Sequence, residues 1–272
     1  MSEADRLHLG FTAEERAQSP YARYFNDELA PLPEHVREAI AIGKQTHELL
    51  PPVERAADLQ REGYWPVETG YARAPDGAAR VFCLTKMPGV TPTMWEWWFA
   101  WHGSEAQRYK LWHPRAHVHV AWADGRNDLT NYAGRTSNVV EYIGSDRLRL
   151  SIRFLKPSEV GLDEAALTAR GEVAICARGS LTGGPVETGY LIHHIRPVPG
   201  GAEMRSRFWI AGSNIRPRGL TGTAANVVAR AAAFAARFAP MAAEELLVHC
   251  AQEMNHLAAI LPALHAEFGP KT

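Results

Sequence analysis

The most specific chemical signal in the sequence is a His-Cys-Ala-Gln-Glu segment near the C-terminus, residues 249–253. In an α-helix, residues four positions apart lie on the same face, so His249 and Glu253 would converge on one point. An imidazole nitrogen and a carboxylate oxygen at such a point suit one divalent cation, and Zn²⁺ accepts both. Glu245 and His256 extend the same stripe. The alternative is an ordinary pair on a solvated helix face, and the spacing alone leaves both open.

A second group of chemically active residues lies in the middle of the chain. His113, His117 and His119 fall within one short segment. If that segment enters a strand, His117 and His119 point to one face, because strand side chains alternate. Each could equally be a core histidine bonded to a backbone carbonyl. Glu141 lies in the strand-like run Ser-Asn-Val-Val-Glu-Tyr-Ile. There it would be either solvated, or inward and costly unless paired or bound to metal.

The neighbours His193 and His194 lie in Tyr-Leu-Ile-His-His-Ile-Arg, which has strand composition. Since adjacent strand residues point to opposite faces, one imidazole is expected to face inward, where it could act as a general acid or base. The sequence contains no Gly-x-Ser-x-Gly elbow, phosphate loop, His-Glu-x-x-His helix or Cys-x-x-Cys pair. The candidate chemistry is therefore a divalent-cation site with a histidine nearby that could act as a general acid or base.

The elements that would position these residues are a series of strands closed by a long helix. Residues 92–112 and 241–261 have helical patterns, and Pro-Gly-Gly at 199–201 predicts a hairpin. A run of antiparallel strands followed by a long helix indicates an α+β fold in which the sheet wraps the helix. Residues 1–70 are rich in helix formers and prolines and are expected to form a helical extension. Strands are expected at 80–85, 118–123, 136–143, 148–154, 172–178, 187–196 and 202–210.

Charge composition argues against a nucleic-acid partner. The 29 Lys and Arg residues are balanced by 30 Asp and Glu residues, for a net charge of −1. Binding to nucleic acid would need a concentrated basic face. Two arginine pairs, Arg205/Arg207 and Arg216/Arg218, are interpreted as partners of local carboxylates or as solvated loop charges.

Cysteine use and hydropathy indicate a cytoplasmic protein. Cys83, Cys176 and Cys250 are odd in number and widely spaced, which is not typical of a disulfide framework. The polar N-terminus has no apolar signal region. The most apolar stretch, residues 224–247, is interrupted by too many charged residues to span a bilayer. We therefore expect no membrane partner.

Four separated motifs together resemble the family of 2,4-diacetylphloroglucinol hydrolases, which includes phloretin hydrolases. They are Trp-Glu-Trp-Trp-Phe-Ala-Trp-His at 95–102, Arg-Tyr-Lys-Leu-Trp-His-Pro-Arg-Ala-His at 108–117, Glu-Met-Arg-Ser-Arg-Phe-Trp at 203–209 and the segment 249–253. The resemblance runs over about residues 70–260. It implies a Bet v 1-like helix-grip catalytic domain over 71–272, with 1–70 as a helical appendage.

The same resemblance implies the reaction and its residues. The family cleaves the carbon–carbon bond between an acyl group and an electron-rich ring, with zinc as cofactor. The implied catalytic residues are Tyr109 and, from the hairpin, His193 in preference to His194. The implied zinc ligands are His117, Glu141, His249 and Glu253.

One residue departs from the family pattern. The family hydrolase has a tyrosine where this chain has Phe208, which puts the ring substrate in doubt. Trp101 and Trp112 are expected to line the cavity with Phe208. The partner is expected to be an acylated phenol or β-diketone, and a homodimer is left open. Two alternatives also remain: a carrier of hydrophobic ligands, which needs no metal, and an O₂-dependent enzyme with a two-His-one-carboxylate iron site.

Overall fold

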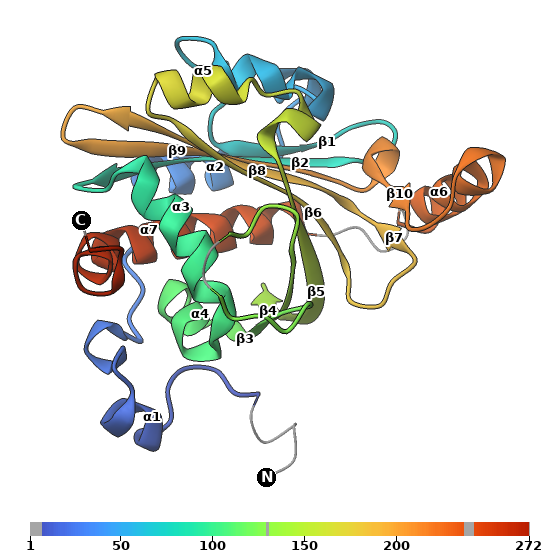
Figure 1. Ribbon diagram of the computed structural model, residues 1–272. Coiled ribbons are helices and arrows are strands. Elements are labelled where there is room, and N and C mark those ends of the chain that lie inside the picture. The colour runs from blue at the N-terminus through green and yellow to red at the C-terminus, as the bar shows by residue number, and fades with distance from the viewer. Residues whose placement is uncertain (1–6, 129–130, 237–241, 272) are drawn as a thin grey trace.

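An antiparallel sheet of eight strands dominates the computed structural model, which describes residues 7–128, 131–236 and 242–271 (Figure 1). Its strand order is β1-β2-β9-β8-β6-β5-β4-β3, so β1 and β3 are the edge strands. A small second sheet pairs β7 (Val186–Glu187) with β10 (Arg216–Pro217). The strands of the large sheet are β1 (Gly70–Arg73), β2 (Ala79–Pro88), β3 (His117–Trp122), β4 (Thr136–Ile143), β5 (Asp146–Leu155), β6 (Val173–Leu181), β8 (Gly189–Val198) and β9 (Gly201–Ile210).

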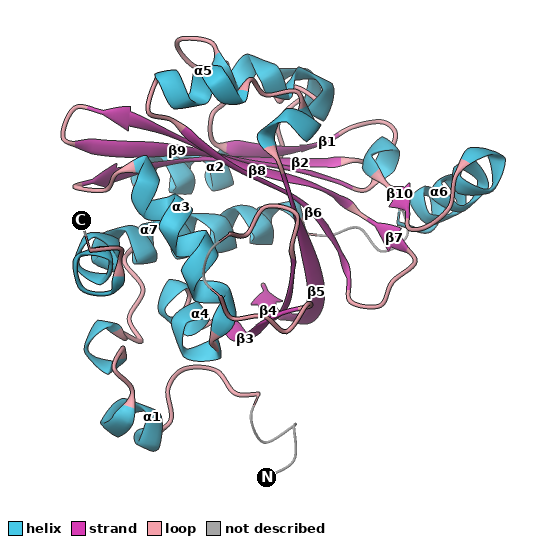
Figure 2. Cartoon of the chain, viewed as in Figure 1, coloured by secondary structure: helices cyan, strands magenta, loops and turns pink. Residues whose placement is uncertain are grey.

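Helices cover both faces of the sheet (Figure 2). The long C-terminal helix α7 (Ala243–Phe268) lies on the inner face with α3 (Pro92–Trp101) and α4 (Ala106–Trp112). Helix α5 (Glu164–Ala169) lies on the outer face. This arrangement confirms the α+β fold predicted from the sequence, in which the sheet wraps a long C-terminal helix, and with it the helix-grip architecture that the family resemblance implied. The remaining helices are α1 (Ala13–Gln18), η2 (Ala22–Tyr24), α2 (Glu34–Ile42), η3 (His47–Leu49), η4 (Val53–Gln60), η6 (Pro157–Val160), η7 (Gly212–Asn214) and α6 (Gly222–Ala236).

Strand alternation divides the core into an inner and an outer layer. In β9, Met204 and Phe208 point inward and pack with α7, whereas Trp209 points outward. The inner cluster gathers most of the buried apolar side chains, and the outer cluster is smaller. Because burial of apolar area is the dominant favourable term in folding, the inner layer is the main source of stability and also the layer that must surround any cavity.

The predicted hairpin is confirmed between β8 and β9, with Val198 paired to Gly201. Gly200 has φ of 82°, a left-handed conformation that glycine adopts without a steric penalty, which explains the Pro-Gly sequence of this turn. The pairing continues without interruption to Gly189 and Ile210. The register of the hairpin therefore fixes which hairpin side chains face the inner layer.

The single helix expected over 92–112 is instead two helices. α3 (Pro92–Trp101) is followed by the 3₁₀ turn η5 (His102–Ser104) and then by α4 (Ala106–Trp112). A Cβ on Gly103 would lie 2.6 Å from the Trp122 ring, so this backbone approaches Trp122 more closely than any other residue would permit. The break turns α4 toward β3 and brings the start of that strand under the helix.

Helix α7 is longer than the sequence indicated. It continues through Pro262 to Phe268, seven residues beyond the predicted end at Leu261. Leu264 is fully buried and Phe268 packs on the inner cluster, so tertiary packing outweighs the usual cost of an interior proline. The predicted start, Met241, lies outside the described residues.

Residues 7–70 pack on both layers. α2 contacts α7 and β1, and Val36 and Ala39 join the inner cluster. The helical sequence pattern of residues 33–50 forms a helix only as far as Ile42, where Gly43, with φ of 80°, caps α2. Leu50, which directly follows η3, and Leu59, on η4, belong to the outer cluster instead.

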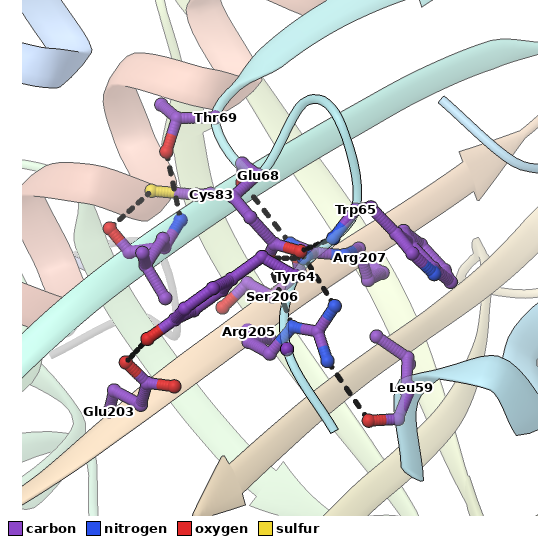
Figure 3. Close-up of polar contacts among 12 residues, drawn as sticks. Leu59, Tyr64, Trp65, Glu68, Thr69, Cys83, Glu203, Arg205, Ser206 and Arg207 are labelled. Carbon is purple, nitrogen blue, oxygen red and sulfur yellow. Dashed lines mark hydrogen bonds and ion pairs between the residues drawn. The ribbon is translucent and has the colours of Figure 1, made fainter. Parts of the chain in front are cut away.

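A buried ionic cluster on the outer face, the Glu68 cluster, joins Glu68 to Arg205 and Arg207 (Figure 3). Arg205 Nη2 lies 2.6 Å from Glu68 Oε1, and Arg207 also contacts the carboxylate. The backbone N–H of Trp65 donates to Glu68 Oε1 at 2.6 Å. The interpretation of the Arg205/Arg207 pair as carboxylate partners is confirmed.

Two further sequence predictions can be compared with the structure. Cys83, Cys176 and Cys250 are all buried and free, as expected for a chain without disulfides. Among the described residues, no helix combines the length and the apolar character that crossing a bilayer requires.

Candidate metal centre and active site

Three of the four predicted zinc ligands form a compact buried group. The ligand atoms of His117, His249 and Glu253 all lie within 4.8 Å of one another. His117 Nε2 is 3.4 Å from Glu253 Oε2, and His249 Nε2 is 3.7 Å from the same oxygen. The fourth predicted ligand, Glu141, is adjacent, with its Oε2 3.7 Å from His117 Nε2. The structure therefore brings all four side chains together.

Two separate parts of the fold supply this group. The i, i+4 spacing on α7 places His249 and Glu253 on the face turned toward the sheet, and both are buried. Residues His117 and Glu141 are direct partners in the β3–β4 ladder. Because directly opposed strand residues carry their side chains about 5 Å apart, this pairing delivers the imidazole and the carboxylate to the same place.

A β-bulge decides which histidine of the middle segment takes part. The β3–β4 register shifts between His117 and His119. Val120 packs in the inner cluster, so its neighbour His119 points the other way and is half-buried. The expectation that His117 and His119 share a face is therefore wrong, because the extra residue of a bulge interrupts the alternation. His113 is near the group and stacks on His249 at 5.1 Å.

The unprotonated nitrogen of His117 faces two carboxylates. The Nδ1 of His117 lies 3.0 Å from the Tyr109 carbonyl oxygen, which can only accept, so Nδ1 carries the proton. The other nitrogen, Nε2, is therefore an acceptor, and it has no hydrogen-bond partner among the described residues. It faces Glu253 and Glu141, whose oxygens are also acceptors when ionised. A divalent cation among these atoms would satisfy all of them, so the donor set fits zinc.

Burial shifts the pKa of every member of this group toward the neutral form. It raises the pKa of Glu141 to about 7, and the nearby Tyr109 hydroxyl opposes this rise. For Glu253, burial and the charge of Glu141 raise the pKa well above its ordinary value. Burial and the neighbouring His113 lower the pKa of His249 to about 3. Neutral imidazoles are the form that binds metals, whereas two buried carboxylates need a cation nearby to ionise.

Tyr109 lies beside the ligand group. Its ring stacks on His117 with the centroids 3.8 Å apart, and its hydroxyl donates to Glu141 Oε2. Burial, followed by the charge of Glu141, raises the pKa of the phenol well above 10. In this structure the phenol is therefore protonated and hydrogen-bonded.

The two hairpin histidines point to opposite faces of the sheet, as the sequence predicted. His193 lines the inner cavity, and its Nδ1 lies 2.8 Å from Ser206 Oγ. His194 turns outward, and its Nε2 lies 2.9 Å from Glu172 Oε2. Burial lowers the pKa of His193 to about 3, so this cavity imidazole is neutral.

A cavity of about 90 Å³ extends from the ligand group between α7, α3, α4 and the sheet. Trp112 and Phe208 line it, as predicted. Trp101 does not appear among the described lining residues: its indole stacks on Trp97 and Phe268, and the Arg108 guanidinium lies over it. Trp101 is therefore part of the aromatic core behind the cavity.

The cavity wall also contains polar residues that sequence reasoning missed. His102, in the turn η5, lines the cavity, and its Nδ1 lies 2.8 Å from the Trp98 carbonyl oxygen. Ser137 lines it too, and its hydroxyl has no partner among the described residues. The Nε1 of Trp112 is likewise without one. A signal for Ser137 existed, because alternation along β4 places it on the same face as Glu141.

The chain is similar to known proteins over most of its length. Residues 49–266 match the model of the DAPG hydrolase PhiG domain family. The chain is 33% identical over 261 residues to a 2,4-diacetylphloroglucinol hydrolase of a Pseudomonas species, covering 92% of this chain and 88% of that protein. It is 32% identical over 275 residues to the phloretin hydrolase of Eubacterium ramulus, covering 96% and 94%. Among solved structures, a ginseng (Panax ginseng) major latex-like protein aligns with a TM-score of 0.32 and 9% identity, covering 63% and 97%.

Proposed function

Because the chain belongs to the DAPG hydrolase family, we propose that it is a zinc-dependent hydrolase that separates an acyl group from a phenolic ring or β-diketone. The family assignment carries the reaction class, a hydrolytic carbon–carbon cleavage of a ketonic phenolic compound. The metal, the ligand set, the catalytic residues and the substrate are the proposed part. The observation that carries the metal is the unpartnered Nε2 of His117, which faces two buried carboxylates.

His117, Glu141, His249 and Glu253 would hold the ion. Bound zinc supplies Lewis-acid polarisation of an oxygen and a lower pKa for a water molecule, its two usual roles in hydrolysis. The hydrogen bond from His117 Nδ1 to the Tyr109 carbonyl fixes the tautomer that leaves Nε2 free for this role.

The residues of the cavity would divide the remaining work. A water oxygen adds to the acyl carbonyl, the bond between that carbon and the ring breaks, and the ring carbon receives a proton. The products are a carboxylic acid and the deacylated ring, so the atoms of one water molecule are accounted for. Tyr109 and His193 both present a group to this cavity. We assign the Tyr109 hydroxyl as the proton donor to the ring carbon, with His193 as its relay partner.

Aromatic walls would exclude bulk water and hold the ring. Phe99, Trp112 and Phe154 line the cavity together with Phe208. The Phe208 ring meets His193 edge-on, with centroids 5.7 Å apart. A tyrosine there would add a hydroxyl in the cavity, so Phe208 bears on substrate preference rather than on the ligand group.

A direct assay tests the proposal. The purified protein, stripped with a chelator and reloaded with zinc, is incubated with acylphloroglucinols and β-diketones, and release of the carboxylic acid is measured. Cleavage that requires zinc and proceeds without O₂ supports the proposal. Binding of these compounds without any cleavage by the zinc-loaded protein would favour a ligand carrier, and a requirement for O₂ would favour an oxygenase.

A further inference from the structure

A second hollow, here called the side channel, adjoins the cavity of the candidate metal centre. Its volume is about 130 Å³. It begins where Phe208 and Leu246 separate it from the cavity and runs along β5 away from α3. Residues lining both spaces are Glu141, Ile152, Leu191, Phe208 and Leu246.

The two spaces differ in chemistry. The cavity presents unpartnered polar groups, the Trp112 Nε1 and the Ser137 hydroxyl, together with His102 and His193. These groups suit the hydroxyls of a phenolic ring, because buried polar groups need hydrogen-bond partners. The lining surface of the side channel is mostly apolar, although Ser180, Thr188 and Tyr190 also border it. Beyond the shared residues, four aliphatic side chains provide a surface that suits an apolar chain. Those side chains are Ile143, Leu148, Leu150 and Ile210.

A glycine keeps the side channel open. Gly179 on β6 lines the channel and is paired with Ile152 of β5. The nearest atom to a Cβ built on Gly179 is Ile152 Cδ1, at 3.9 Å, so alanine would fit without strain. A larger side chain at this position would project into the space. At the other end, Leu148 and Leu150 are only half-buried, so the channel reaches toward the surface.

We propose that the side channel is the subsite for the acyl arm of the substrate, and that the enzyme prefers arms longer and more apolar than acetyl. This inference rests on the proposed function, since it needs the acyl carbonyl to lie near Glu141, where the two spaces meet. The ring then occupies the polar cavity, and the arm extends between Phe208 and Leu246 along β5. The substrate class is an acylphloroglucinol, or related acylphenol, with an alkyl or arylalkyl arm.

A chain-length series tests the subsite. Acetyl-, butanoyl-, hexanoyl- and 3-phenylpropanoyl-phloroglucinol are compared by kcat/KM with the zinc-loaded enzyme. Each buried methylene should raise kcat/KM by about three- to fourfold until the channel is full. A flat series, or one that falls with length, would overturn the inference while leaving the proposed hydrolase activity intact.

Substitution at Gly179 tests whether the chain-length preference arises in the side channel. In Gly179→Val the hexanoyl-to-acetyl ratio of kcat/KM should fall about tenfold or more, since several methylenes lose their site. In the matched control Gly179→Ala the ratio should be retained. Leu150→Phe, at a half-buried lining position, gives a second test if the valine variant does not fold. An unchanged ratio in both blocking variants would refute the channel as the arm subsite.

Binding separates this inference from the proposed function. Quenching of tryptophan fluorescence by the same four ketones measures affinity whether or not they are cleaved. If the zinc-loaded enzyme cleaves none of them, the proposed function fails, but tighter binding of longer arms that is lost in Gly179→Val still supports the subsite. Equal affinity for all four ketones contradicts it.

Discussion

Two buried carboxylate clusters lie on opposite faces of the same sheet and differ in what surrounds them. On the outer face, Glu68 is held between the guanidinium groups of Arg205 and Arg207. On the inner face, Glu253 and Glu141 face neutral imidazoles, and the described residues bring no Lys or Arg side chain into ion-pair contact with them. The outer cluster is electrostatically complete as the chain folds, whereas the inner cluster has carboxylates without a cation.

The directions of the pKa shifts express the same difference. Burial alone would raise the pKa of Glu68, but the charges of Arg207 and Arg205 lower it below its ordinary value. For Glu253, burial and the charge of Glu141 both raise the pKa. The chain therefore contains both solutions to the cost of burying a carboxylate: one has its cations built in, and the other is arranged to receive one.

The largest expected effect is a loss of turnover when a hydroxyl is removed on the inner face but not on the outer face. Tyr109→Phe should lower kcat by about 10²–10⁴-fold with zinc retained, because positioned proton transfer typically contributes that much. The matched control is Tyr64→Phe, which removes a hydroxyl that donates to Glu203 at 2.9 Å on the outer face. Zinc content and steady-state rates are measured for both. Near-normal turnover in Tyr109→Phe, with zinc bound, would reduce Tyr109 to a core aromatic and leave His193 as the donor.

The second expected effect is a loss of stability when the carboxylate of the outer-face cluster is removed. Glu68→Gln removes the carboxylate that pairs with the Arg205 and Arg207 guanidinium groups, and should lower the free energy of unfolding by about 3 kcal/mol. The substitution should not change the zinc content or the turnover of the folded protein. Urea unfolding followed by circular dichroism measures the first quantity. A loss of zinc in Glu68→Gln would mean that the two clusters are not independent.

A smaller effect is expected at the cavity wall. Phe208→Tyr should lower KM for diacetylphloroglucinol by about two- to tenfold, because one added hydrogen bond contributes about 0.5–1.5 kcal/mol. The free energy of unfolding should change little, since Phe208 borders a cavity and a hydroxyl can be accommodated there. An efficient wild type that the substitution does not improve would show that the departure from the family tyrosine is neutral.

The smallest effect is the pH dependence of the outer cluster. Because the folded-state pKa of Glu68 is lowered, its contribution is complete above the ordinary carboxylate pKa and is lost as pH falls below it, when the unfolded chain binds the proton first. The difference in unfolding free energy between wild type and Glu68→Gln should therefore narrow on acidification from pH 7 to pH 4. A difference that stays constant or widens would contradict the pairing.

Sequence reasoning reached the parts of the site that depend on local geometry. The i, i+4 spacing on α7 places His249 and Glu253 on one face, and the alternation in β8 predicts that one of His193 and His194 faces inward, which the structure shows to be His193. The orientation of Glu141 could not be decided in this way, because alternation leaves either face open until the β3–β4 register is known. The bulge beside His117 has no signature in the spacing of the histidines, so the choice of His117 depended on the family motif.

Tertiary packing explains the remaining failures. Trp101 and Trp112 are both aromatic helix residues, but the break at Gly103 places one in the core and the other on the cavity. The Glu68 partner of Arg205 is 137 residues distant in sequence, so only the general expectation of a carboxylate partner could be formed. The sequence predicted no role for His102, because nothing in the local sequence indicates that the turn η5 faces the cavity.

Metal binding tests the central claim most directly. Wild type, Glu253→Gln and Glu68→Gln are stripped with a chelator, titrated with zinc and analysed for bound metal after gel filtration. We expect about one zinc per chain in wild type and in Glu68→Gln. In Glu253→Gln the zinc affinity should fall at least about tenfold, because loss of even an outer-shell partner typically weakens metal binding by about 10–100-fold. Full zinc occupancy with unchanged affinity in Glu253→Gln, or a wild type that binds no zinc, would contradict it.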